Sequence, residues 1–197
     1  MGLFDALLGR TKAVPANLDN LFALPSAAIT LETAAGLRSS GHAGVCFKPS
    51  GTQSGADAAA EVRGLLGLDD ESDGPAGVLR SVDDEYGYRW LLVDDEDLGN
   101  LVTRVHLVNT TLEEHGFGPQ LLCSAFGFTP TADADQSARA AVLVYLFKRG
   151  SFYPFCPTGA EQRDNEAELR LSSLLGADLP QEQDLSRWMA LWGLPVS

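Results

Sequence analysis

Residues 140–157 read AAVLVYLFKRGSFYPFCP and form the most aromatic stretch of the chain. Within it, residues 142–147 are an unbroken run of β-branched and other apolar side chains. Such a run predicts a strand that is covered on both faces, in the middle of a sheet. Lys148, Arg149 and Gly150 interrupt the run. The rest of the chain is expected to pack around this strand.

Composition limits the kind of protein this can be. The chain has 197 residues, of which 45% are hydrophobic, so it is long enough for one domain with a sizeable core. Its net charge is −13, from 27 acidic and 14 basic residues. A general nucleic-acid binder needs a basic surface, and so does a protein that adheres broadly to anionic lipid. The charge therefore argues against both classes.

The three cysteines, Cys46, Cys123 and Cys156, show no CxxC spacing and lie in apolar surroundings. We expect buried, reduced thiols in a cytoplasmic protein, with no metal site and no cofactor. The chain has no run of about 20 apolar residues, as a membrane span would need. The first twelve residues lack the basic and apolar regions of a secretory signal.

Residues 1–14 are expected to form an amphipathic segment separate from a single domain at 15–197. If the segment is helical, four apolar side chains share one side of it: Leu3, Phe4, Leu7 and Leu8. Pro15 separates the segment from the rest. The apolar side could dock on the protein's own domain, or it could contact a partner helix or a membrane interface.

The first half of the remaining chain predicts short elements. A helix is expected from Asn17 to about Pro25, a strand over 28–33, a Gly/Ser loop over 36–44, and a second strand over 44–48. A small helix follows over 56–68. The acidic stretch after it resembles a calcium loop, but Arg80 stands where that loop needs a bidentate Glu. A solvated surface loop is the better interpretation.

The second half has stronger patterns. Residues 78–82 and 86–93 predict a hairpin, and 98–115 predict the longest helix, with the acids at 94–97 at its amino end and Gly116 as its stop. Residues 121–128 predict a strand antiparallel to the one at 142–147. A helix is expected over 162–175.

A last short helix is expected after Pro180, with Trp188 and Trp192 one turn apart as a lid on the core. The strands come in hairpin-like pairs and do not alternate strictly with helices. This order predicts a single-domain α+β fold with a largely antiparallel sheet and helices mainly on one face.

No catalytic group stands out in the sequence. Ser124 and Ser151 lie outside any GxSxG turn, and nothing in the spacing pairs Cys156 with His106 or His115. The sequence predicts no catalytic residue and favours a protein that is not an enzyme.

One polar cluster follows the central run, with a basic pair beside aromatic residues. Its members could hold an anionic group: Lys148, Arg149, Tyr153 and Arg163. The alternative is that Arg149 and Arg163 form surface salt bridges with Asp164 and neighbouring acids.

Several segments together resemble one protein family. They are MGLFDALLGRTK, NLDNLFALPSAAITLETAAG, NTTLEEHGFGPQLLCSAFGF, VLVYLFKRGSFYPFCP, QRDNEAEL and DLPQEQDLSRWMALWG. The chain is similar over nearly its whole length to the actinobacterial family called phage shock protein A-associated protein B. The resemblance implies an association with phage shock protein A, a coiled-coil protein that guards the cytoplasmic membrane under stress. It carries over no catalytic residue.

Two functions follow from the residues and the resemblance. The first is a non-enzymatic cytoplasmic adaptor or regulator of the envelope-stress response that binds a helical partner through Leu3, Phe4, Leu7, Leu8, Trp188 and Trp192. The second is a small-molecule or anion-binding protein, or an unrecognised enzyme. It would use a pocket between sheet and helices lined by Tyr88, Trp90, Tyr153 and Arg149. A homodimer and peripheral contact with the inner face of the membrane are left open.

Overall fold

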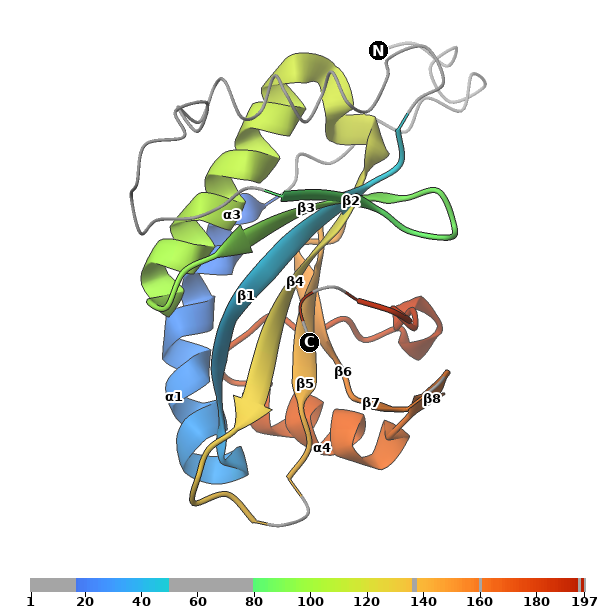
Figure 1. Cartoon of the computed structure of the whole chain (residues 1–197). Coiled ribbons are helices and arrows are strands. Elements are labelled where there is room, and N and C mark those ends of the chain that lie inside the picture. The colour runs from blue at the N-terminus through green and yellow to red at the C-terminus, as the bar shows by residue number, and fades with distance from the viewer. Residues whose placement is uncertain (1–16, 50–79, 136–137, 160, 195, 197) are drawn as a thin grey trace, which may run out of the picture.

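The computed structural model describes residues 17–49, 80–135, 138–159, 161–194 and 196. Within them, six strands form one antiparallel sheet in the order β2-β3-β1-β4-β5-β6, and a two-stranded ribbon pairs β7 with β8 (Figure 1). The strands of the sheet are β1 (Leu37–Phe47), β2 (Arg80–Asp83), β3 (Arg89–Asp94), β4 (Leu121–Pro130), β5 (Ala141–Leu146) and β6 (Ser151–Phe155). The ribbon strands are β7 (Pro157–Gly159) and β8 (Gln162–Arg163).

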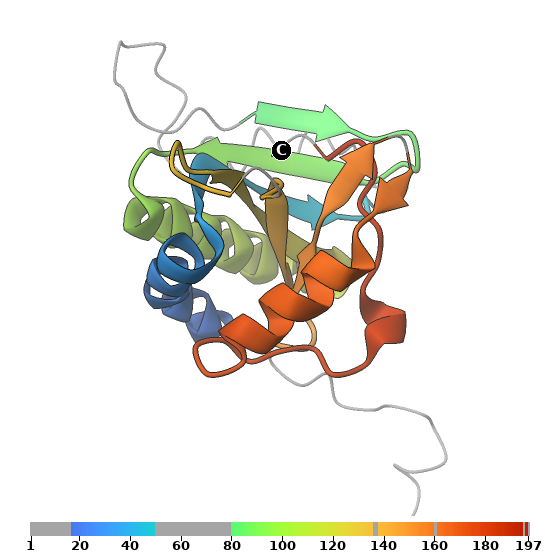
Figure 2. The same cartoon turned by 90° about the horizontal axis from the view of Figure 1, so that it is seen from below.

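The helices are α1 (Leu24–Ala35), α3 (Leu98–Leu112) and α4 (Asn165–Leu175) in the described part of the chain. Short helical turns are η1 (Leu18–Ala23), η2 (Glu113–Phe117), η3 (Gly118–Gln120) and η4 (Leu185–Arg187). All three α-helices contribute to one apolar core on the same face of the sheet (Figure 2). We call this the helical face. The predicted α+β class, antiparallel sheet and one-sided helices are confirmed.

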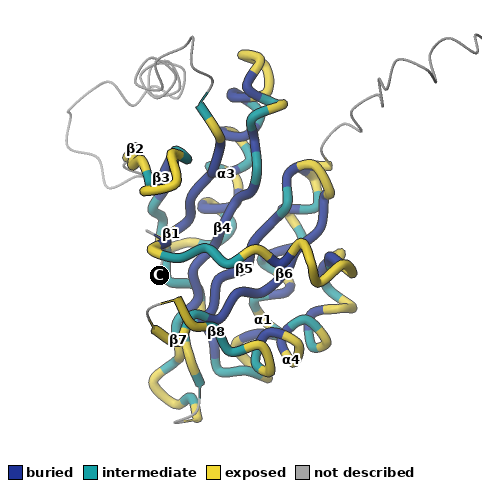
Figure 3. Tube along the Cα trace, turned by 90° about the vertical axis from the view of Figure 1, so that its right-hand side faces the viewer, coloured by how far each residue is buried: buried dark blue, intermediate teal, exposed yellow. Residues whose placement is uncertain are grey.

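The strand at 142–147 is buried as predicted, but it is not the centre of the sheet. β5 pairs with β4 on one side and β6 on the other, and Val142 to Tyr145 are buried. The central pair is β1 and β4, which are dark blue over much of their length in Figure 3.

The predicted strand at 28–33 is wrong, because these residues belong to α1. Leu24, Ala27 and Leu31 are buried at helical spacing, although the local sequence also alternates. Pro25 does not end a helix but occupies its first turn, where the missing N–H costs nothing. Gly36 then ends α1 with a φ of 63°, which a glycine adopts without strain.

The predicted loop at 36–44 is also wrong, because β1 begins at Leu37. Its register against β4 shifts between Ser39 and Ala43, and the polar side chains fall in this irregular half of the strand. Gly/Ser-rich sequence here marks a bulge and not a connection.

The hairpin, the long helix and the β4–β5 pair follow the sequence patterns closely. α3 is capped by Asp97, whose side chain accepts a hydrogen bond from the Asn100 amide at 2.8 Å. Asp94 and Asp95 instead contact neighbouring basic side chains: Asp94 is hydrogen-bonded to His42 Nδ1 and pairs with Arg80, and Asp95 pairs with Arg104. The predicted helix at 56–68 and the calcium-like stretch lie largely outside the described residues.

Candidate functional site

The face of the sheet opposite the helices is covered by irregular chain. Residues 180–194 together with Val196, which we call the C-terminal segment, begin beside β6, where Gln181 forms a bridge with Phe152, and from Trp188 onward they pack on this second face (Figure 1). Only the short turn η4 is helical within it, so the predicted helix after Pro180 is wrong. Trp188 and Trp192 reach the sheet although the chain between them is not helical, because the segment is held by contacts made at separate points.

One contact that holds the C-terminal segment in place involves a buried ion pair between α4 and the end of β8. The Glu168 carboxylate is 2% exposed and accepts hydrogen bonds from the Arg163 Nε and from the Cys156 amide, at 2.8 and 2.9 Å. Arg163 also donates from Nη1 to the carbonyl oxygen of Trp188 at 2.8 Å. Arg163 therefore ties α4 to the C-terminal segment, and its charge is compensated by Glu168.

A second set of hydrogen bonds joins β6 to the start of the C-terminal segment. The Phe152 amide donates to the Pro180 carbonyl and the Glu182 amide donates to the Phe152 carbonyl, at 2.7 and 2.8 Å. The Glu182 carboxylate accepts from Arg149 Nε and Ser151 Oγ, at 3.0 and 3.1 Å. Burial raises the pKa of Glu182, but the Asp184 amide, Arg149 and Ser151 outweigh it and lower this pKa overall.

Aromatic contacts hold the middle of the segment. The Trp188 ring stacks on Tyr153 with 5.8 Å between centroids, and Trp192 meets Phe155 edge-on at 5.3 Å. The Tyr153 hydroxyl donates to the Met189 carbonyl at 2.9 Å. The expectation that the two tryptophans form a lid on the core is therefore confirmed, although the helix is not.

Two glycines make room for the end of the segment. A Cβ on Gly44 would lie 3.1 Å from the Trp90 ring and 3.3 Å from Val196 Cγ1. A Cβ on Gly127 would overlap the Val196 carbonyl oxygen and the Ser40 hydroxyl. Both positions need a residue without a side chain, since the chain passes directly over them.

A pocket of about 280 Å³ lies between the second face and the C-terminal segment. Its lining includes three of the residues predicted for a small-molecule site, Tyr88, Trp90 and Tyr153, but not Arg149. The pocket is on the side of the sheet away from the helices, which differs from the predicted place. We call it the aromatic pocket, because Tyr86 and Trp192 also line it.

Two thiols lie at the floor of the aromatic pocket. Cys46 on β1 and Cys123 on β4 are direct register partners, and both are buried and free. A hydrogen bond with Cys123 and burial raise the pKa of Cys46. The Cys46 thiol is therefore protonated at neutral pH and acts as a small apolar group.

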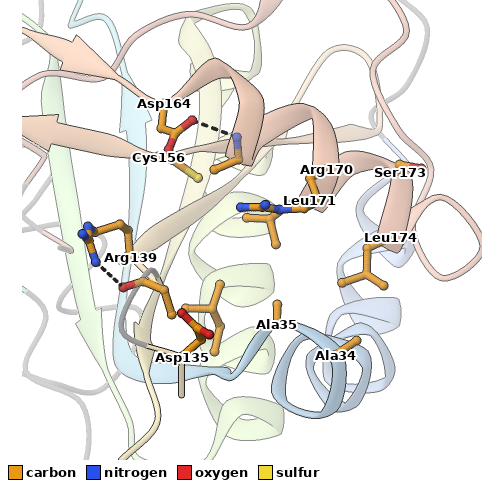
Figure 4. Close-up of a pocket in the computed structure, with 13 residues that line it drawn as sticks. Ala34, Ala35, Asp135, Arg139, Cys156, Asp164, Arg170, Leu171, Ser173 and Leu174 are labelled. Atoms are coloured by element: carbon orange, nitrogen blue, oxygen red, sulfur yellow. Dashed lines mark hydrogen bonds between the residues drawn. The ribbon is translucent and has the colours of Figure 1, made fainter.

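Another pocket, of about 630 Å³, lies between the end of α1, one side of α4 and the loop after β4 (Figure 4). Asp135, Arg139 and Arg170 bring charges of both signs to it, and Asp164 caps α4 by accepting from the Ala167 amide. Burial, with help from Glu168 and Asp164, raises the pKa of the Cys156 thiol to about 12. A protonated thiol is a poor nucleophile, so the pocket presents no activated group on Cys156.

The residues of the predicted anion site lie in different places. Lys148 donates to the Pro119 carbonyl at 2.7 Å, and Arg149 pairs with Glu182. Arg163 pairs with Glu168, and Tyr153 lines the aromatic pocket. The predicted salt bridges of the two arginines form with Glu168 and Glu182 and not with Asp164. The anion site stays a prediction.

Sequence reasoning missed the site residues Asp84, Cys46 and Cys123. Asp84 sits in the hairpin turn, where its carboxylate accepts from the amides of Tyr86 and Tyr88 and from Trp90 Nε1. Three acids, residues 83–85, follow one another in this turn, so nothing in the pattern distinguishes Asp84 from its neighbours. Leu3, Phe4, Leu7 and Leu8 lie outside the described residues.

The fold defines the structural class of the protein, and a comparison with known families shows its family. The protein is of the α+β class, with one antiparallel sheet that carries helices on one face. Among the described residues, none of the helices has the length and apolar character of a membrane span. The family model described as PspA associated protein B matches residues 1–196, and the chain belongs to this family. No curated protein and no solved structure matches the chain.

Proposed function

We propose that the protein is a non-enzymatic cytoplasmic adaptor of the phage-shock type of envelope-stress response, and that it binds PspA as a helical partner. The family description supports this proposal, because it names an association with PspA. An adaptor needs an exposed apolar surface that its own fold does not use. Such a surface lies beside α4.

The observation that carries the proposal is a hollow of about 320 Å³ between α4 and the C-terminal segment. Leu169 and Leu185 line it and are 51% and 56% exposed, and the rest of its lining is Trp188 with the polar side chains of Arg163, Asn165 and Glu168. Apolar side chains that share an exposed hollow are typical of protein interaction sites. We call it the leucine hollow, and we expect it to receive apolar side chains of a partner helix.

Charge supports a protein partner over a lipid surface. The net charge of −13 repels anionic lipid but attracts basic side chains on a partner. Of the predicted contacts, Trp188 lines the leucine hollow, while Trp192 faces the aromatic pocket. The amino-terminal residues Leu3, Phe4, Leu7 and Leu8 remain a second proposed contact.

The test is size-exclusion chromatography with light scattering of the full-length protein mixed with purified PspA. Leu169→Gln with Leu185→Gln should weaken the complex at least about tenfold, since the variant loses the apolar area of two leucines that the partner would bury. Ile29→Gln is the matched control, because Ile29 is 66% exposed on α1, away from the hollow. Removal of residues 1–12 tests the amino-terminal contact separately.

A wild-type protein that forms no complex at tens of micromolar would contradict the adaptor proposal. A complex that the double variant forms as well as the control variant does would remove the leucine hollow from it.

A further inference from the structure

The aromatic pocket is lined by an unusual set of rings. Three of the four tyrosines and two of the three tryptophans line it, whereas none of the nine phenylalanines does. Indole and phenol rings carry negative charge on their faces, and indole attracts cations most strongly. The pocket therefore concentrates the rings that suit a positively charged group.

The charge in the lining has the matching sign. Asp84 is the one charged side chain among the described lining residues, and no lysine or arginine is among them. Its carboxylate is oriented by three N–H donors, from Tyr86, Tyr88 and Trp90, at 2.9, 2.8 and 3.3 Å. None of these donors is a cation, so the negative charge of Asp84 has no ion-pair partner in the described part of the chain.

One of the rings already holds an ammonium group of the protein itself. Lys48 Nζ lies 4.4 Å from the centroid of the Tyr88 ring and donates to the Tyr86 carbonyl at 2.9 Å. Lys48 does not line the pocket, so this contact is at its rim. The β2–β3 hairpin therefore already accommodates one ammonium group, against the Tyr88 ring and the Tyr86 carbonyl.

We propose that the aromatic pocket binds a small organic cation, an ammonium group carried on an apolar body. The ammonium group lies against the aromatic rings near Asp84, and the apolar body packs against Leu122, Leu146 and the two thiols of the floor. A volume of about 280 Å³ suits a ligand of roughly ten non-hydrogen atoms. This binding is separate from the adaptor function and uses a different surface from the leucine hollow.

The charge dependence is tested by isothermal titration calorimetry of the full-length protein with three probes that share a benzene ring. Benzyltrimethylammonium should bind with a dissociation constant at least about tenfold lower than that of benzyl alcohol, as a cation–π contribution predicts. Benzenesulfonate should not bind, because Asp84 repels it. Equal binding of cation and alcohol, or no saturable binding of the cation, would overturn the proposal.

The place of binding is tested with Tyr86→Ala, which should weaken the cation at least about threefold by removing one ring. Tyr86 is 51% exposed, so the fold should tolerate the change. Phe22→Ala is the matched control, since Phe22 is 49% exposed and lies on η1 outside the pocket. Equal weakening in both variants, or none in Tyr86→Ala, would place the cation elsewhere and overturn the assignment.

Discussion

The two faces of the sheet are covered by different means. The helical face is covered by α1, α3 and α4, and its core is built from aliphatic and aromatic side chains in regular elements. The second face is covered by the irregular C-terminal segment. Hydrogen bonds of Arg163 and Glu182 hold this segment in place, and it passes directly over Gly44 and Gly127.

Apolar burial in regular elements dominates the first face, with a few buried polar contacts such as the hydrogen bond from Asn109 Nδ2 to Ser124 Oγ at 2.9 Å. The second face depends on polar contacts at separate points along an irregular segment. Because the C-terminal segment is held at separate points, the aromatic pocket can remain between it and the second face.

The largest expected effect compares the same substitution on the two faces. Leu101→Ala on α3 should lower the free energy of unfolding by about 4 kcal/mol, because Leu101 is fully buried among rigid helices. Leu194→Ala in the C-terminal segment should cost about 2 kcal/mol or less, since the irregular chain can collapse around the missing atoms. Urea denaturation of both variants measures the difference. Equal losses would mean that the second face is as tightly packed as the first.

The next largest effect concerns the buried ion pair. Arg163→Ala should cost about 3 kcal/mol, because Glu168 keeps its charge in a site where it is 2% exposed. Adding Glu168→Gln to this variant should restore part of the loss. Thermal unfolding checks this, with Lys148→Ala as the control for removing an exposed cation. A double variant less stable than Arg163→Ala would show that Glu168 acts chiefly through the Cys156 amide.

A smaller effect is expected at Gly127, over which the end of the C-terminal segment passes. Gly127→Ala should cost about 2 kcal/mol through the clash with the Val196 carbonyl, and it should loosen the end of the C-terminal segment. Hydrogen exchange should rise in residues 188–194 and stay unchanged in α3. Gly176→Ala is the control, because a Cβ there meets only carbonyl oxygens at 3.5 and 3.6 Å. Faster exchange in α3 as well would contradict independent closure of the two faces.

The smallest effect is a pH dependence confined to the second face. The pKa of Glu182 is lowered by its hydrogen bonds in the folded state, so its contribution is present above the unfolded pKa of about 4.3. It should be lost as the pH falls through the lowered folded value. Glu182→Gln should therefore reduce the loss of stability on acidification by about 1 kcal/mol, measured by urea denaturation at pH 6 and pH 3.5. A variant with an unchanged pH profile would refute this.

The sequence predicted the helical face much better than the second face, and the reason is physical. Periodic patterns such as Leu101, Val105 and Leu112 report burial of a regular element against one core. The C-terminal segment has no period, and its place depends on long-range partners such as Arg163 with Trp188. The two errors near the amino end have different origins: Ala28 to Thr33 satisfies both a helical and an alternating pattern, whereas the Gly/Ser-rich residues after Gly36 form an irregular part of β1.

The candidate sites were predicted only in part. Tyr88, Trp90 and Tyr153 were expected to line one pocket together with Arg149; the three aromatic residues do so, but on the other side of the sheet and without Arg149. The pairing of Cys46 with Cys123 requires the register of β1 against β4, which depends on a bulge. Local sequence could not supply it.

The position of the C-terminal segment also matters while the protein is being made. The strands of the sheet that the structure describes all precede it in the chain, so a ribosome delivers them, together with α1, α3 and α4, before the second face has its cover. During that interval Trp90, Tyr153 and Phe155 present an apolar surface to the cell. The nascent chain is therefore most prone to aggregation in the interval between the emergence of β6 and that of the C-terminal segment, and it is at this stage that it most needs a chaperone.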